Sequence, residues 1–295
     1  MFFSDICTVM KEYPQIKISE WEPVGEGFNG QAYVSEKHPG KLLKIVRTEM
    51  GSAAKIEQEF YASRVALEAG LPTPEVYEIV RDGKDHGYLS ERIAGKKSFS
   101  RLCADQPERI PEYAAQMAGY AKDLHKRPIS IGPYVPSVKS LLLSALDSSP
   151  IVSEGQREWF QSFVSAMPDS GTCLHGDMQP GNIILARGKP YWIDLGWLSQ
   201  GCHMMDLAHL YKMMVDDSVI PQVQDLTHLT PEQMKAFWEA FARSYTGKAD
   251  VEALNRELLP YAALDMVRSF YLHPNYNPPF MDFCRARIGG YCPDI

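Results

Sequence analysis

Hydrophobic and polar residues follow different patterns in the two parts of the chain. In the first ninety residues, short apolar runs alternate with polar or glycine-rich turns. These runs are WEPV at 21–24, QAYVS at 31–35, KLLKIV at 41–46, PEVYEIV at 74–80 and GYLSERI at 87–93. Short runs of this kind, bounded by turn residues, predict β-strands.

One helix is predicted among these strands, in SAAKIEQEFYASRVALEAG at 52–70. Ser52 is a suitable N-cap, and Gly70 is a natural residue just past the helix end. Four residues fall on one face at helical spacing: Ile56, Phe60, Ser63 and Leu67. Pro72 and Pro74 prevent the helix from continuing.

Helical spacing dominates after Gly95. The helical segments are 111–125, 137–147, 154–167, 231–245 and 251–271, and strand-like runs remain at 172–175, 182–188 and 189–196. The pattern therefore predicts an α+β chain with two lobes. A small β-rich N-terminal lobe, residues 1–92, precedes a larger and mainly helical C-terminal lobe, residues 93–295, and they join near SERIAG at 90–95.

Composition narrows the class of protein. The 295 residues are 45% hydrophobic and 23% charged, with a net charge of −7 and no dense block of Lys and Arg, which argues against nucleic-acid binding. No apolar run reaches the roughly 18 residues of a membrane-spanning helix. The start, MFFSDICTVMKEYP, is too short and polar for a secretory signal. Six cysteines without a CxxC pair or zinc-like spacing fit reduced thiols, so we expect a cytoplasmic protein.

Three glycines form a GxGxxG motif: Gly25, Gly27 and Gly30 in VGEGFNGQAYV. In a dinucleotide-binding fold this motif opens a helix. Here a strand-like run follows it, which suits a flap whose backbone N–H groups cover phosphates. An ordinary glycine-rich turn between strands would have the same sequence.

A lysine lies fourteen residues after Gly30, inside the apolar run KLLKIV. Burying Lys44 is costly unless it is paired. One function for such a lysine is to contact nucleotide phosphates while a helix glutamate holds it. Glu57 and Glu59 flank the apolar face of the predicted helix on opposite sides, and we favour Glu59. Lys41 is the alternative lysine.

The stretch HGDMQPGN at 175–182 cannot be a helix interior or a central strand. Pro180 lacks an N–H group, and Gly176 and Gly181 favour unusual backbone angles. It is therefore a shaped loop that carries polar side chains. We expect His175 to hold this loop by hydrogen bonds.

Two carboxylates and a carboxamide stand out around this loop. Asp177 and Asn182 are five residues apart, and Asp194 follows twelve residues later in YWIDLG, at the end of an apolar strand. Mg²⁺ prefers a few protein oxygens completed by water and phosphate. Phosphoryl transfer also needs a carboxylate to orient an acceptor hydroxyl and accept its proton. These three residues supply both kinds of group.

Taken together, these motifs resemble the aminoglycoside phosphotransferase and choline kinase superfamily, the small-molecule relatives of protein kinases. The matching segments are GEGFNG, LLKIV, EFYASRVALEAGLPTPEV, SERIAG, Leu124–His125, HGDMQPGN, IDLG and Asp206–Ala208. They extend from residue 24 to about residue 210. The combination HGDxxxxN followed by IDxG is highly specific for this group.

The resemblance implies a protein-kinase-like bilobal fold and a role for each matching residue. Asp177 would be the catalytic base, and Asn182 and Asp194 would bind Mg²⁺. Lys44, paired with Glu59, would hold the α- and β-phosphates of ATP. Two further groups would bind ATP: the flap glycines Gly25, Gly27 and Gly30, and the adenine-reading backbone of Ser90, Glu91, Arg92 and Ile93. Asp206 would brace the catalytic loop.

Two departures from protein kinases favour a small acceptor. The motifs are HGD and DLG rather than HRD and DFG, and only nine residues separate Gly196 from Asp206, which leaves no APE-like activation segment. We therefore predict an ATP- and Mg²⁺-dependent phosphotransferase that moves the γ-phosphate to a hydroxyl of a small molecule resembling an aminoglycoside, choline or a sugar. A non-catalytic nucleotide-binding module and, less favoured, a protein kinase are the alternatives. The oligomeric state is left open.

Charge in the last eighty residues bears on the acceptor. Asp216, Asp217, Asp265 and Asp282 lie in the part that should form the acceptor pocket. Acidic walls attract cations, so an alcohol bearing an amino or quaternary ammonium group is expected, although solvated surface carboxylates would give the same pattern. Several aromatic residues there could line a cation site but are more readily explained as core: Trp238, Tyr261, Phe270, Tyr271 and Tyr276.

Overall fold

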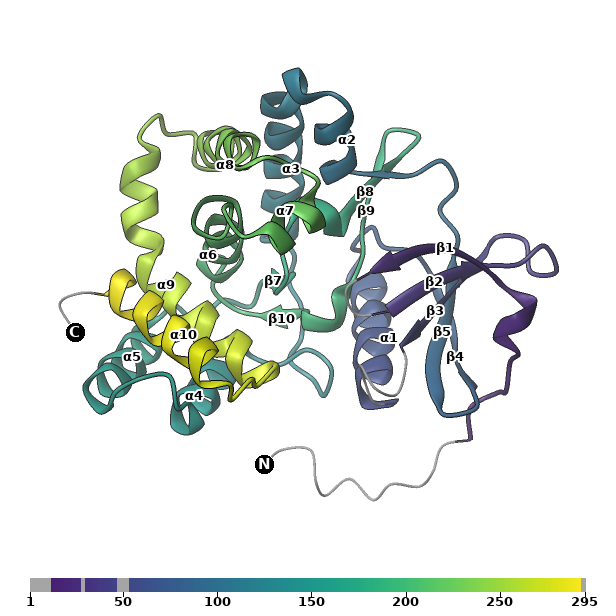
Figure 1. Cartoon of the computed structure of the whole chain (residues 1–295), viewed down its shortest axis with the longest axis horizontal. Coiled ribbons are helices and arrows are strands. Elements are labelled where there is room, and N and C mark those ends of the chain that lie inside the picture. The colour runs from purple at the N-terminus through teal and green to yellow at the C-terminus, as the bar shows by residue number, and fades with distance from the viewer. Residues whose placement is uncertain (1–11, 28–29, 47–52, 293–295) are drawn as a thin grey trace. The chain divides into compact units, whose positions relative to one another are not determined.

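The computed structural model describes residues 12–27, 30–46 and 53–292. They group into two compact units. The first comprises residues up to 64 together with 74–94, and the second comprises 65–73 together with the chain from 95 onward. Figure 1 labels most elements of both units. The expected α+β class is confirmed, because the first unit is built on an antiparallel sheet and the second is mainly helical.

The first unit contains a five-stranded antiparallel sheet in the order β1-β2-β3-β5-β4. Its elements are β1 (Glu22–Gly27), β2 (Gly30–Val34), β3 (Lys41–Val46), β4 (Val76–Asp82), β5 (Asp85–Glu91) and α1 (Ala53–Glu68), which this unit includes as far as Arg64. All five predicted strands and the predicted helix are present. Gly70 follows α1 with a φ of +76°, a left-handed angle that suits glycine. The expected cap, Ser52, lies outside the described residues.

Alternation along β3 gives this sheet two different faces. Leu43 and Ile45 join a cluster with Trp21 on one face. Val46 belongs to the opposite cluster, which includes Ile56 and Phe60 of α1. Because side chains alternate along a strand, Lys44 lies on the same face as Val46, toward α1.

The second unit holds nine α-helices that lie wholly within it and five short strands among its described residues. Its helices are α2 (Phe99–Asp105), α3 (Ile110–Leu124), α4 (Val138–Ser148), α5 (Glu154–Ala166), α6 (Met204–Tyr211), α7 (Pro221–Thr227), α8 (Pro231–Thr246), α9 (Val251–Leu272) and α10 (Pro278–Tyr291). Its strands are β6 (Lys97–Ser98), β7 (Cys173–Leu174), β8 (Ile183–Ala186), β9 (Lys189–Trp192) and β10 (Ser199–Gln200). Helix α3 packs on α8, and α9 contacts both α6 and α10.

Four helices were not predicted from the sequence. Helices α2 and α7 span only seven residues each, too few for a clear period. Nearly every residue of α6 is buried, including Asp206, so its sequence lacks an apolar and a polar face. Two prolines begin α10, and two glycines lie in its last turn. Such residues normally indicate a loop.

Two of the predicted helices begin at capping boxes. Helix α5 starts with a capping box of Ser153 and Gln156, and α8 with one of Thr230 and Gln233. Gly247 ends α8 with a φ of +71°. Local sequence therefore decides where these two helices begin and where α8 ends.

Only two of the five aromatic residues considered for a cation site are core, and Tyr261 and Tyr271 are half-buried. Trp238 and Phe270 are buried, so they cannot line an open cation site, and Trp238 packs its ring against Tyr211 and Phe241. Tyr276 is exposed.

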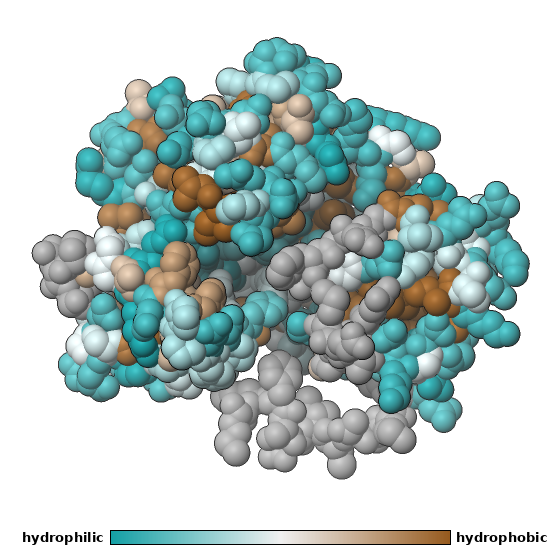
Figure 2. Space-filling view, in the orientation of Figure 1, coloured by the Kyte–Doolittle hydropathy of each residue, from teal (hydrophilic) through white to brown (hydrophobic). Residues whose placement is uncertain are grey.

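Figure 2 shows hydrophilic residues over most of the face in view, with hydrophobic residues in separate groups. Within the described ranges, no helix is both long and apolar enough to cross a membrane.

Candidate active site

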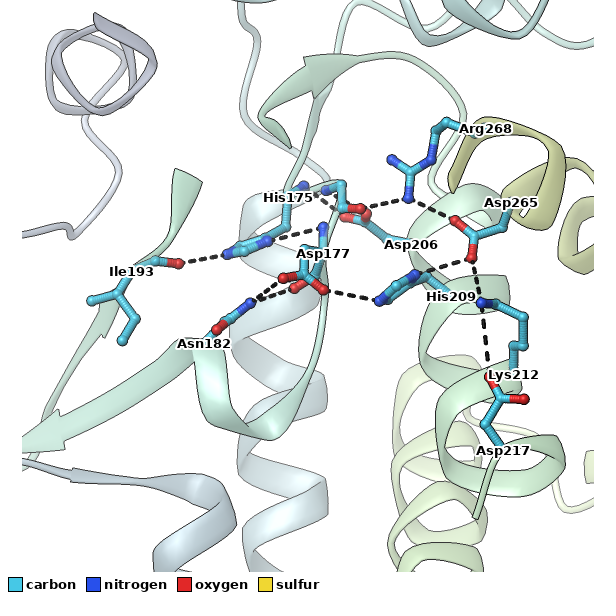
Figure 3. Close-up of polar contacts among 11 residues, drawn as sticks. His175, Asp177, Asn182, Ile193, Asp206, His209, Lys212, Asp217, Asp265 and Arg268 are labelled. Atoms are coloured by element: carbon cyan, nitrogen blue, oxygen red, sulfur yellow. Dashed lines mark hydrogen bonds and ion pairs between the residues drawn. The ribbon is translucent and has the colours of Figure 1, made fainter. Parts of the chain in front are cut away.

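The loop HGDMQPGN connects β7 to β8, as the sequence predicts for an irregular segment (Figure 3). Gly176 has a φ of +81°, and a Cβ there would lie 2.1 Å from the carbonyl oxygen of Trp197. No other residue fits that space. Pro180–Asn182 form a 3₁₀ turn before β8 begins.

Buried hydrogen bonds hold the first residues of this loop. Asp206 of α6 accepts from the backbone N–H of His175 at 2.7 Å and from that of Gly176 at 2.8 Å. The ring of His125 lies 3.1 Å from the same carboxylate. Asp206 thus holds the start of the loop by two hydrogen bonds, in line with the supporting role expected for it.

His175 connects the loop to the end of β9. Its Nε2 donates to the carbonyl of Ile193 at 3.0 Å, and its Nδ1 accepts from the N–H of Asp177 at 3.2 Å. One nitrogen donates and the other accepts, which identifies the ring as a neutral tautomer. His175 therefore orders the loop and has no free nitrogen for chemistry.

Two donors contact the carboxylate of Asp177, whose side chain is 26% exposed. Asn182 Nδ2 donates to Oδ2 at 2.8 Å and to the Asp177 carbonyl at 2.9 Å. His209 of α6 lies 3.0 Å from Oδ1. Burial opposes the charged form of Asp177, but the hydrogen bond and charge of His209 outweigh burial and hold its pKa below the usual value. Asp177 is therefore ionised at neutral pH.

Asn182 and Asp194 lie on neighbouring segments. The N–H of Ile193 donates to the carbonyl of Asn182 at 3.0 Å, which places Asp194 one residue beyond a direct backbone link. The Asn182 amide nitrogen donates to Asp177, so its Oδ1 is the atom that can bind a metal. Asp194 is exposed and adopts φ 57° and ψ 52°. Non-glycine residues rarely adopt such angles, and they often do so at functional sites.

This donor set fits Mg²⁺. One carboxylate and one carboxamide oxygen are hard ligands, and their small number leaves coordination positions for water and phosphate.

The left-handed angle at Asp194 also explains why β9 ends at Trp192, although the sequence predicted a strand as far as Gly196.

The first unit contains the predicted lysine pair. Lys44 Nζ lies 2.6 Å from Glu59 Oε1, and the hydroxyl of Tyr88 donates to the same oxygen at 2.7 Å. Glu57 instead accepts from the hydroxyl of Tyr13. The structure thus selects Glu59 over Glu57. Lys41, the alternative lysine, lies over the ring of Tyr77.

The glycine motif joins two paired antiparallel strands, as expected, with Gly27 opposite Gly30. A Cβ on Gly30 would lie 2.7 Å from the carbonyl oxygen of Ile45, so close packing on β3 requires this glycine. Phe28 and Asn29, at the tip of the motif, lie outside the described residues. The register shift near Gly25 marks an irregularity in β1.

Backbone bonds narrow the prediction for residues 90–93. The N–H of Glu91 donates to the carbonyl of Glu75 at 2.7 Å, and the N–H of Arg92 donates to Gly40 at 2.8 Å. These two donors are therefore already used within the first unit. If this segment binds adenine, its carbonyl groups and the N–H of Ile93 are the groups that would form the hydrogen bonds.

The predicted acidic wall is wrong for two of its four residues. Asp265 is fully buried and pairs with His209 at 3.0 Å, Lys212 at 3.2 Å and Arg268 at 2.6 Å. Asp217 lies between Lys212 and Arg287. Their charges are balanced inside the protein, so they cannot attract a cation.

The other two acidic residues differ from each other. Asp216 accepts a hydrogen bond from the hydroxyl of Tyr291 at 2.7 Å, whereas Asp282 is exposed beside Arg285. Formal net charge could not distinguish the four, because it does not record which carboxylates have basic partners.

Sequence reasoning missed His209. Its contacts are with residues 32 and 56 positions away, which no local pattern reveals. The one available signal was its position three residues after Asp206, which places both on one side of α6.

The fold and this site together define a kinase-like phosphotransferase. A profile of the APH phosphotransferase enzyme family matches residues 20–241, and the chain belongs to this family. It is a small-molecule kinase. No protein among those with curated descriptions matches the sequence.

Solved structures share the fold at low sequence identity. A choline/ethanolamine kinase family protein from Mesorhizobium loti is 17% identical with a TM-score of 0.58, covering 92% of this chain and 87% of that one. A thermostable mutant of the aminoglycoside phosphotransferase APH(4)-Ia, in its apo form, is 15% identical with a TM-score of 0.61, covering 92% and 93%. The amicoumacin kinase hAmiN, in complex with AMP-PNP, Ca²⁺ and Ami, is 14% identical with a TM-score of 0.51, covering 95% and 90%.

Proposed function

We propose that this phosphotransferase moves the γ-phosphate of ATP to a hydroxyl of a small molecule with the help of Mg²⁺. The observation that carries the proposal is the arrangement of the loop 175–182. An ionised carboxylate, Asp177, is hydrogen-bonded to Asn182, which in turn is linked through the backbone to the segment bearing Asp194.

In this proposal Asp177 receives the acceptor hydroxyl. The acceptor oxygen forms a bond to the γ-phosphorus while the bond to the β-phosphate oxygen breaks, and the hydroxyl proton passes to Asp177. The products are ADP and a phosphate ester. Because the lowered pKa makes Asp177 a weak base, it orients the hydroxyl first and takes the proton late, as a loose transition state requires.

Asn182 and Asp194 would hold the metal ion. When bound, Mg²⁺ neutralises charge on the phosphates. The protein contributes the Oδ1 of Asn182, whose amide nitrogen is engaged by Asp177, and the carboxylate of Asp194.

We further propose that the predicted N-terminal lobe, residues 1–92, binds the nucleotide. Lys44, held by Glu59 and Tyr88, would contact the α- and β-phosphates. The flap glycines Gly25, Gly27 and Gly30 would cover the phosphates, and the segment 90–93 would read adenine.

The chemical class of the acceptor is the most detailed part of the proposal. Two of the similar structures are named as a choline/ethanolamine kinase family protein and an aminoglycoside phosphotransferase. The compounds in both names are alcohols that carry nitrogen. This favours an amino- or ammonium-bearing acceptor. We also propose a cytoplasmic location, which the free thiols of Cys103, Cys173, Cys202, Cys284 and Cys292 support.

An acceptor screen tests the proposal. Hydroxylated metabolites and antibiotics, grouped as cationic, neutral and anionic, are incubated with MgATP while ADP release is measured. We expect release that depends on a cationic alcohol and disappears in Asp177→Asn. Thermal stabilisation by MgATP without transfer to any acceptor would instead indicate a nucleotide-binding module, and turnover confined to sugar phosphates or carboxylic acids would refute the cationic preference.

A further inference from the structure

His209 lies between two carboxylates (Figure 3). Its Nε2 is 3.0 Å from Asp177 Oδ1 on the loop, and its Nδ1 is 3.0 Å from Asp265 Oδ2 on α9. The His209 side chain is 13% exposed, and that of Asp265 is fully buried. Both ring nitrogens are thus committed to acidic partners in a largely enclosed place.

When an ionised carboxylate faces each nitrogen of a histidine ring, both nitrogens must carry a hydrogen to donate. A neutral imidazole has only one N–H, whereas an imidazolium has two. Asp265 also accepts from Lys212 and Arg268, so it is the ionised form. Asp177 accepts from Asn182 as well, which likewise favours its charged form.

The titration behaviour agrees with this geometry. Burial favours a neutral ring at His209, but the charge of Asp265 and the hydrogen bonds to both carboxylates outweigh it and raise the pKa to about 9. The cations facing this cluster are Lys212, in the short π-helix that follows α6, and Arg268, on α9.

Asp265 anchors more than the ring. Arg268, which it holds at 2.6 Å, donates from the same nitrogen to the carbonyl of Gly176 at 2.6 Å. Helix α9 is therefore linked to two adjacent residues of the loop. Arg268 of α9 contacts Gly176 directly, and Asp265 of α9 is linked to Asp177 through His209 of α6. This connection fixes the loop against the helical core.

We propose that His209, held as an imidazolium by Asp265, is a positioning residue that fixes the orientation and charge of the Asp177 carboxylate for phosphoryl transfer. The proposal rests on the proposed function of Asp177. His209 binds one carboxylate oxygen and Asn182 the other, so the carboxylate cannot rotate. Each oxygen keeps a second acceptor position for the acceptor hydroxyl.

His209→Gln tests the proposal, because glutamine is neutral and cannot donate to both carboxylates with the geometry of the ring. We expect kcat to fall by about 10- to 100-fold, the scale of an impaired general base, with unchanged affinity for a non-hydrolysable MgATP analogue. Wild-type kcat should decline as pH rises through about 9, and His209→Gln should lack that decline. A purely structural role would not remove a limb of the pH profile.

The matched control is His203→Gln at the start of the same helix. His203 packs its ring near His125 and Tyr245 and has no hydrogen bond to Asp177 among the described contacts. We expect wild-type kcat and an unchanged pH profile. If His209→Gln keeps wild-type kcat, the inference is wrong.

A measurement on the wild-type protein covers the case in which His209→Gln fails to fold. Nitrogen-15 NMR of the His209 ring near neutral pH should show both nitrogens protonated, and a neutral ring would overturn the inference. Asp177→Asn is assayed in parallel. Full activity of Asp177→Asn refutes the proposed function, whereas an inactive Asp177→Asn beside a fully active His209→Gln refutes the role of His209 alone.

Discussion

Asp177 and Asp194 are both carboxylates near one loop, yet their surroundings differ. Asp177 is partly buried and bonded to His209 and Asn182, whereas Asp194 is exposed in a left-handed conformation. The first environment suits the proposed base, and the second suits the proposed ligand of a metal ion.

Replacing each aspartate by asparagine should separate these two roles. Asp177→Asn keeps the shape and should bind MgATP normally while turnover falls at least about 10²-fold. Asp194→Asn removes a charge from the proposed metal site, so Mg²⁺-dependent nucleotide binding should weaken together with turnover. Calorimetry with a non-hydrolysable ATP analogue, with and without Mg²⁺, measures the contrast. Loss of binding in Asp177→Asn with normal binding in Asp194→Asn would show that the roles are reversed.

The two lysines of β3 offer a matched pair of variants. Lys44→Ala removes the partner of Glu59 and should raise the KM for ATP and slow transfer, because the predicted contact is with phosphate. Lys41→Ala removes the contact with the ring of Tyr77 and should behave as wild type. Steady-state kinetics at varied ATP concentration decides the matter, and wild-type ATP kinetics for Lys44→Ala would disprove its assignment.

Helices α6 and α9 support the catalytic loop through a buried ionic cluster. Asp265 is shared by His209, Lys212 and Arg268, and Asp206 receives two backbone N–H groups of the loop. Such clusters cost desolvation energy when they form, but removing one partner leaves uncompensated buried charge. The cluster is thus a sensitive link between the helices and the loop.

Asp265→Ala should therefore destabilise the protein by about 3–5 kcal/mol, the cost of breaking a buried ion pair. The control is Asp282→Ala on α10, because that aspartate is 71% exposed beside Arg285 and exposed pairs contribute little. Urea unfolding of both variants measures the difference. Equal stabilities would mean that the buried cluster contributes no more than a surface pair.

Gly176→Ala tests the loop itself. A Cβ at this position would meet the Trp197 carbonyl oxygen at 2.1 Å, and the φ of +81° is unfavourable for alanine. The backbone must therefore shift and carry Asp177 with it. We expect lost turnover and lower thermal stability, whereas Gly188→Ala, also at positive φ but with open space around it, should keep turnover. Wild-type activity in Gly176→Ala would contradict the described loop conformation.

For the molecule as a whole, the free energy of unfolding should fall at both ends of the pH range. The folded-state pKa of His209 is raised from 6.5 to about 9, so its contribution is complete below 6.5 and is lost as pH rises through about 9. The folded-state pKa values of Asp206 and Asp265 are lowered, because hydrogen bonds and cationic partners outweigh burial. Their contribution is lost as pH falls below about 4.

Urea unfolding at about pH 3, 7 and 9.5 checks this dependence. Wild type should lose up to about 3 kcal/mol more than His209→Gln between neutral and alkaline pH, the equivalent of the His209 shift. Parallel losses in the two proteins would contradict a charged His209.

Local sequence determined much of this protein. Short apolar runs bounded by turn residues predicted the five strands of the first unit, and helical spacing predicted most of the long helices. Gly176 and Pro180 predicted the irregular loop, and the motifs from GEGFNG to IDLG indicated the family that the profile confirms. These features depend on neighbours along the chain, so they can be read without coordinates.

Tertiary structure alone decided how the charged groups pair. Glu59 rather than Glu57 meets Lys44, because strand alternation places Lys44 toward α1 and packing sets the rotation of that helix. Asp265 is turned inward to His209, Lys212 and Arg268 rather than outward to a cation. His209 reaches Asp177 across 32 residues of sequence. Each of these contacts joins separate elements, and their energies depend on burial and distance, which no spacing along the chain encodes.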